Sequence, residues 1–123
     1  MSYVQRHAVS LTTAADGSAT GYTPVVTGRI ETLRYVKTDF VDGVDFAVTL
    51  EATGEAVWSQ SDVNASATVA PRQATHDVLG AASLYAGAGE PVEDKIAVAN
   101  DRIKIVVAQG GDTKTGTVHV TLG

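Results

Sequence analysis

The chain has 123 residues, and we expect one domain spanning residues 1–123, because a division would leave pieces near the lower limit for an independent core. Hydrophobic residues make up 44% and aromatic residues only 6%, and Ala and Val supply most of the hydrophobic share, which favours β-structure over a helical bundle. The net charge of −5 and the scattered basic residues argue against a nucleic-acid partner, since phosphate contacts require clustered Lys and Arg.

The absence of cysteine excludes disulfides and thiolate metal sites and fits assembly in a reducing cytoplasm. Residues 1–7 lack the apolar segment of a secretion signal, and no run approaches the roughly 18 apolar residues of a membrane helix. We therefore expect a protein that is neither exported by a cleaved signal nor inserted in a membrane.

The first half of the chain reads as strands separated by polar turns. Residues 4–11 alternate between apolar and polar side chains and predict a first strand, which a loop of small polar residues at 14–21 follows. Residues 25–37 are long enough for a bent strand or two consecutive strands, and Gly28 is a candidate bulge.

A turn and a hairpin are predicted next. Asp42-Gly43 is a turn signal that leads into an alternating run, and Gly54 permits a reversal, so residues 45–60 predict a hairpin. Pro71 cannot donate a ladder hydrogen bond, which makes the short run at 68–70 an edge strand or a strand end.

Residues 71–93 lose the strand periodicity. The stretch 73–85 has room for one helical turn, but Gly80 and the flanking glycines argue against a longer helix. An irregular connection of this length is uncommon in a compact domain and is often functional. We expect a loop that contacts a partner.

The C-terminal segment carries the clearest alternation. Apolar residues recur at every second position in 103–107 and again in 118–122, and a Gly-rich loop separates the two runs, which predicts a closing β-hairpin. In all we expect seven or eight short strands. The fold class is therefore predicted to be all-β, an antiparallel β-sandwich or a jelly-roll-like domain.

Three histidines, His7, His76 and His119, lack the spacing that would put two imidazole rings on one metal ion. His7 and His119 fall in predicted strands and are interpreted as surface-facing or hydrogen-bonded. His76-Asp77 is an adjacent histidine and carboxylate pair, but neighbours in an extended segment point in opposite directions. We expect this pair to orient the loop or contact a partner, and we predict that the protein is not an enzyme.

Two acidic clusters suggest calcium at first sight. Asp39, Asp42 and Asp45 lie around one turn, and the segment 62–66 reproduces the opening of an EF-hand loop without its Gly or terminal Glu. Hydrogen bonding of these side chains to their own turn backbone is the favoured interpretation.

Two further patterns are interpreted as structural. Residues 110–116 contain Gly, Lys and Thr, but Asp112 and Thr113 interrupt the phosphate-loop motif, and a strand follows where that motif needs a helix. Trp58 could join the tyrosines in a sugar-stacking platform, but a lone Trp in a hairpin strand is more often a core or interface anchor.

Several short motifs between Gly28 and the C-terminus together resemble small virion proteins of tailed bacteriophages, which are encoded among head and structural genes. The Pro-Arg loop and the Ala-Gln-Gly-Gly segment are the distinctive pair. The motifs are Gly28-Arg29-Ile30, Thr53-Gly54-Glu55, Ala70-Pro71-Arg72, His76-Asp77, Gly80-Ala81-Ala82 and Arg102-Ile103-Lys104-Ile105-Val106-Val107-Ala108-Gln109-Gly110-Gly111.

The resemblance implies a structural role and offers no catalytic residues to carry over. We expect a head decoration or minor capsid protein that binds the major capsid protein on the outer surface of the head, as a homotrimer and without a cofactor. Its location would be the virion, after assembly in the host cytoplasm. The alternative is a phage tail-associated or carbohydrate-binding β-sandwich module.

The candidates for partner contact all lie in the irregular loop, where no periodic pattern requires apolar side chains. The apolar members either form an intersubunit patch or plug the open end of the sandwich. The candidates are Arg72, His76, Val78, Leu79, Leu84 and Tyr85.

Overall fold

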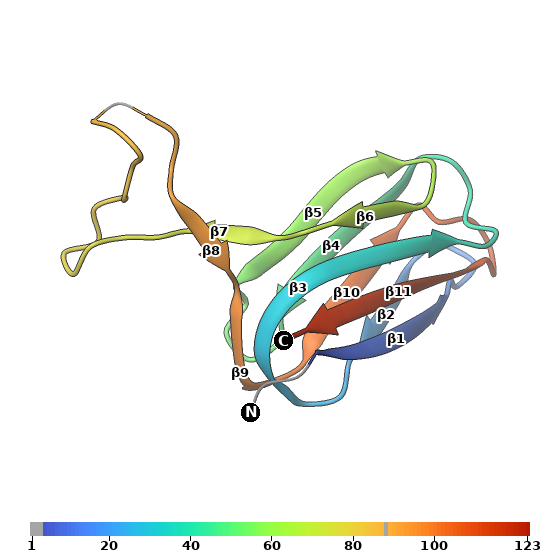
Figure 1. Cartoon of the computed structure of the whole chain (residues 1–123). Helices are drawn as coiled ribbons and strands as arrows, with labels where there is room; N and C mark the ends of the chain where they lie inside the picture. The colour runs from blue at the N-terminus through green and yellow to red at the C-terminus, as the bar shows by residue number, and fades with distance from the viewer. Residues whose placement is uncertain (1–3, 88) are drawn as a thin grey trace.

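In the part of the chain that the structure describes, eleven antiparallel strands form two facing sheets and a projecting two-stranded arm (Figure 1). The computed structural model describes residues 4–87 and 89–123, and no helix occurs among them. The predicted all-β sandwich is confirmed. The strand number exceeds the expected seven or eight because a short strand at 19–22 and two strands of the arm, at 72–74 and 93–95, carry too little alternation to be recognised.

The first sheet is built around one long strand, β3, which pairs with β11 on one edge and with β6 on the other. β9 pairs with the N-terminal end of β3, and β1 closes the far side of the sheet by pairing with β11. The members are β1 (Gln5–Thr12), β11 (Thr115–Leu122), β3 (Val26–Lys37), β6 (Ala67–Val69) and β9 (Ala97–Asp101).

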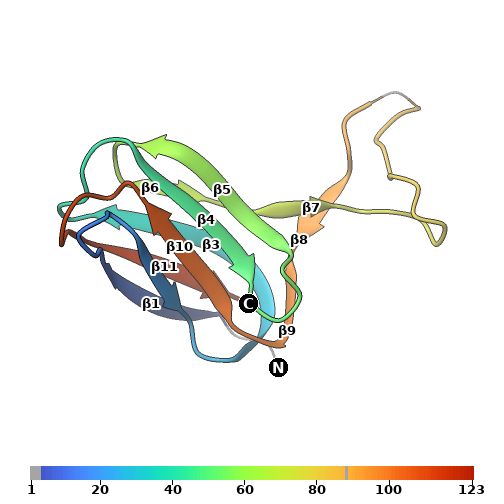
Figure 2. The same cartoon turned by 180° about the vertical axis from the view of Figure 1, so that it is seen from behind.

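The second sheet has four strands in the order β2, β10, β4, β5 and lies behind the first sheet in Figure 1, as Figure 2 shows from the other side. β7 and β8 pair only with each other and form the stem of the arm. The members are β2 (Ala19–Tyr22), β10 (Ile103–Ala108), β4 (Val44–Leu50), β5 (Ala56–Val63), β7 (Arg72–Ala74) and β8 (Glu93–Lys95).

The core lies between the two sheets and is filled by the apolar stripes that the alternation predicts. Ile103, Ile105 and Val107 of β10 are fully buried, and so are Val118 and Val120 of β11. A cluster of aromatic rings closes one part of the core, formed by Tyr35, Phe40, Phe46 and Trp58 with centroid separations of 4.6 to 6.4 Å.

The predicted closing hairpin is wrong. β10 pairs with β2 and β4 in the second sheet, whereas β11 pairs with β1 and β3 in the first. The Gly-rich loop therefore crosses from one sheet to the other. Thr13 holds this loop in place, because its hydroxyl donates to the Gly111 carbonyl at 2.5 Å and accepts from the Lys114 amide at 2.8 Å.

Three other sequence predictions are confirmed. β3 bends at a register irregularity between Val26 and Gly28, the predicted bulge. β4 and β5 form the predicted hairpin, with Gly54 at φ 77° and its amide donating to the Leu50 carbonyl at 2.8 Å. Pro71 lies two residues after the end of β6, which is an edge strand, and marks the point where the chain leaves the sheet.

Candidate functional site

The segment predicted as an irregular loop is an ordered arm with its own hydrogen bonds. β7 and β8 pair through Arg72 and Lys95 at the base and through Ala74 and Glu93 further out. The pairing continues outward, because the Thr75 amide donates to the Val92 carbonyl at 2.8 Å. The stretch 73–85, in which the sequence left room for one helical turn, forms strand β7, a turn at residues 78–80 and two antiparallel bridges instead.

The arm ends in two small loops. Bridges between His76 and Ala82 and between Leu84 and Pro91 fold the outer arm back on itself twice. Figure 1 shows both loops standing clear of the sandwich. We call residues 73–94 the distal arm.

The base of the arm is fixed to β3. The Arg72 guanidinium donates to the carbonyls of Glu31 at 3.2 Å and Ile30 at 3.4 Å, where the edge of β3 is left between β6 and β9. Lys95, opposite Arg72, forms an ion pair of 2.6 Å with Glu31. Arg72 is therefore part of the anchorage of the arm, and its predicted contact with a partner stays a prediction.

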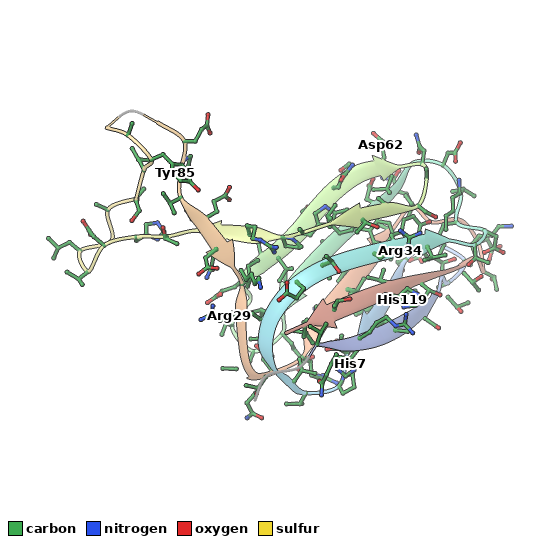
Figure 3. The ribbon with its side chains drawn as sticks, viewed as in Figure 1. His7, Arg29, Arg34, Asp62, Tyr85 and His119 are labelled. Carbon is green, nitrogen blue, oxygen red and sulfur yellow. The ribbon has the colours of Figure 1, made fainter. Side chains whose placement is uncertain are left out.

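The apolar candidates lie at the outer end of the arm and are exposed. Relative exposures are 100% for Val78, 91% for Leu79, 77% for Tyr85 and 39% for Leu84. Tyr85 is seen on the arm far from the two sheets in Figure 3. Of the two interpretations that the sequence left open, plugging the end of the sandwich is therefore wrong, because these side chains do not reach the sandwich.

His76 and Asp77 do not form a catalytic pair in the described structure. Asp77 Oδ1 accepts from the amides of Leu79 at 2.9 Å and Ala81 at 3.0 Å, and this carboxylate shapes the first terminal loop. His76 lies in the bridge to Ala82 and is exposed. The arrangement matches the expected loop-orienting role.

The two acidic clusters meet at the opposite end of the sandwich, but their oxygens are used for internal hydrogen bonds. Asp45 accepts from the Asp62 amide at 3.0 Å, the Asn64 side chain accepts from the Gly43 amide at 2.7 Å, and Asp42 pairs with Lys37 at 2.7 Å. Within residues 4–87 and 89–123, no group of three or more His, Asp or Glu side chains could hold a metal ion.

Asp39, from the same cluster, accepts from the backbone amide and the hydroxyl of Thr115. The bond from the amide is the main reason that the pKa of the Asp39 carboxyl lies below its usual value. This carboxylate joins the loop after β3 to the start of β11, which is a structural role.

The aromatic side chains do not assemble a sugar-stacking platform in the part of the chain that the structure describes. Trp58 is half-buried and stacks on Phe46, Tyr35 is buried, and the Arg102 guanidinium lies 4.1 Å from the Tyr22 ring centroid. Tyr85 stands alone on the arm. Tyr3 lies outside the described residues.

Sequence reasoning missed a second surface, the outer face of the first sheet. Register places Ala8, His119, Arg34 and Thr68 in one row across four strands, and Arg34 donates to the Thr68 hydroxyl at 2.8 Å. We call this surface the hydroxyl face because seven of its members are Ser or Thr. Its outward residues are Arg6, Ala8, Ser10, Thr12, Thr32, Arg34, Val36, Thr68, Thr115, Thr117, His119 and Thr121.

Two buried imidazole nitrogens belong to the same sheet. His119 Nδ1 and His7 Nε2 are buried with no hydrogen-bond partner. Figure 3 shows His119 and Arg34 on neighbouring strands of the face that turns toward the viewer. The alternation of small polar residues in β1 and β11 was the available signal for the hydroxyl face, but the strand order needed to assemble it is not local.

Fold and site together define an all-β sandwich with a projecting, apolar-tipped arm. No helix in the described residues is long and apolar enough to span a bilayer. No protein-family model matches the chain, and no curated protein matches it significantly.

Proposed function

We propose that the chain is a structural virion protein that binds the outer surface of a tailed-phage head as a capsid decoration or minor capsid protein. The observation that carries the proposal is the distal arm, which leaves Val78 and Leu79 almost fully exposed to solvent and Tyr85 largely exposed. Monomeric proteins rarely expose grouped large apolar side chains without a partner for them. An extended, anchored arm of this kind suits a protein whose work is to contact neighbouring subunits on a lattice.

The sandwich supplies what such a role needs from the rest of the molecule. Its core is built from β-branched residues between two sheets, and charged side chains fix the base of the arm. Because the sandwich is rigid, a contact made by the arm would hold two neighbouring subunits in a fixed relative position. The proposed role is structural, and it assigns no catalytic residue.

Capsid binding is tested by co-sedimentation. Purified wild-type protein is mixed with phage capsids that lack it, and in parallel with purified tails, and each mixture is centrifuged and assayed for saturable binding. The proposal expects saturation on capsids and a rise in their resistance to heat. Binding to tails alone would favour the tail-associated alternative, and binding to neither would contradict both.

A further inference from the structure

The distal arm carries negative charge and differs in this from the base of the arm. It contains four carboxylates and no Lys or Arg, and the two basic residues of the arm, Arg72 and Lys95, stay at the base, bound to β3. Asp77 and Glu90 bring negative charge to the outer part of the arm, where the exposed apolar side chains also lie, whereas Glu93 and Asp94 lie in the stem strand β8. The four carboxylates are those of Asp77, Glu90, Glu93 and Asp94.

The hydroxyl face has the complementary character. Its outward residues include two arginines, Arg6 and Arg34, and no Asp or Glu, in a chain whose net charge is −5. The one carboxylate of β3, Glu31, is neutralised by Lys95. On the same face as the arginines, Ala8, Val36 and the threonine methyl groups offer small apolar contacts.

We propose that the distal arm of one copy docks on the hydroxyl face of a second copy of this chain. Opposite charges favour the encounter and fix its orientation, and the exposed Val78 and Leu79 lose water against the methyl groups of the sheet. The distal arm cannot dock on the hydroxyl face of the same copy, because it projects away from its own sandwich in both views (Figures 1 and 2).

The contact is head-to-tail, since the arm and the hydroxyl face are different surfaces. Each copy then offers one arm and one face, and the assembly either closes into a ring or grows as an open chain. A closed ring of three copies corresponds to the trimer that the resemblance to phage virion proteins implies. Like charges would oppose an arm-to-arm contact, because every distal arm carries the same four carboxylates.

Two double variants test the contact, one altering the distal arm and the other altering the hydroxyl face. Val78→Ser combined with Leu79→Ser changes only the arm, and Arg6→Glu combined with Arg34→Glu changes only the face. Lys104→Glu reverses one charge on the outer side of the other sheet and serves as the control. Circular dichroism and melting curves verify that every variant is folded.

Sedimentation velocity at a series of concentrations measures the assembly. Wild type and the Lys104→Glu control should associate, while the arm and face variants should each have a dissociation constant raised about tenfold or more. A mixture of the two variants should form dimers and stop there, because one intact arm meets one intact face and the mutated surfaces block further growth. Added salt should weaken the wild-type assembly.

Three outcomes would overturn the inference: a monomeric wild type, a face variant that assembles like wild type, or a mixture that stays monomeric. The inference rests on the proposed function only in treating the arm as an intersubunit contact. The sedimentation experiment contains no capsids, so it tests self-assembly alone. A protein that self-assembles but does not bind capsids would contradict only the proposed function. A protein that binds capsids as a monomer would contradict only the arm-to-face contact.

Discussion

Burial of Tyr35 has one part that stabilises the fold and one part that destabilises it. Its ring is buried and packs 4.6 Å from the Phe46 ring centroid, yet its hydroxyl is buried without a hydrogen-bond partner. Burial, with a smaller contribution from the Asp39 charge, raises the pKa of Tyr35 to about 12. The ring therefore stabilises the core, whereas the oxygen opposes burial.

Replacing Tyr35 by Phe keeps the ring and removes the unpartnered oxygen. We expect Tyr35→Phe to raise the free energy of unfolding at neutral pH by about 1 kcal/mol, because a buried unsatisfied hydroxyl costs on that order. Urea denaturation measures the change. A clear loss of stability would mean that the hydroxyl has a partner in solution, such as a bound water.

The same substitution predicts a change at alkaline pH. Because the pKa of Tyr35 is raised in the folded protein to about 12, its neutral form favours folding. This contribution is intact below the unfolded pKa near 10 and is lost as pH rises toward the folded value. Between pH 10 and 12 the wild type should therefore lose more stability than Tyr35→Phe. Parallel loss in both proteins would contradict the shifted pKa.

At the level of elements, alternation in the sequence identified buried faces but not strand partners. The stripes of β10 and β11 are buried as predicted, yet the two strands lie in opposite sheets. Either arrangement buries the same side chains, so the pattern could not separate them. The six residues between the strands, more than a tight hairpin needs, were the one local indication.

The arm was recognised as unusual but not as ordered. Its stem strands have three residues each, and its outer part is joined by isolated bridges. Segments this short show no periodic pattern of apolar and polar residues. Its anchor depends on Arg72 reaching carbonyls about forty residues earlier in the chain. Contacts of that separation are invisible to a reading of neighbouring residues.

Removing the Arg72 guanidinium should loosen the arm without unfolding the sandwich. We expect Arg72→Met to lower hydrogen-exchange protection at amides in β7 and β8 and to cost about 1 kcal/mol of global stability, since its bonds to the β3 carbonyls are partly buried. Exchange mass spectrometry reads the two regions separately. Lys104→Met, which removes a half-buried cation from the other sheet, is the control and should leave the arm protected.

At the level of the whole molecule, the core and the arm are separate. The hydrophobic core contains residues from both sheets but none of the described residues between 70 and 95. The sequence allowed the fold class and the apolar arm residues to be predicted, because both depend on local composition. The hydroxyl face could not be predicted from the sequence, since its rows combine residues of strands from both ends of the chain.

This separation predicts that the arm can be shortened. Replacing residues 76–91 by Asn-Gly should keep the Thr75 and Val92 ends together as a two-residue hairpin and leave the melting temperature within a few degrees of wild type. Differential scanning calorimetry tests this. A large drop in melting temperature would show that the outer arm supports the core.

The position of the arm between β6 and β9 has a mechanical consequence. Both strands pair with β3, one on each side of the point where Arg72 and Lys95 fix the arm. A pull on the arm is therefore shared by two groups of backbone hydrogen bonds rather than peeling one strand from its end. A protein that holds neighbouring subunits under internal pressure would have its attachment point where the sheet resists tearing.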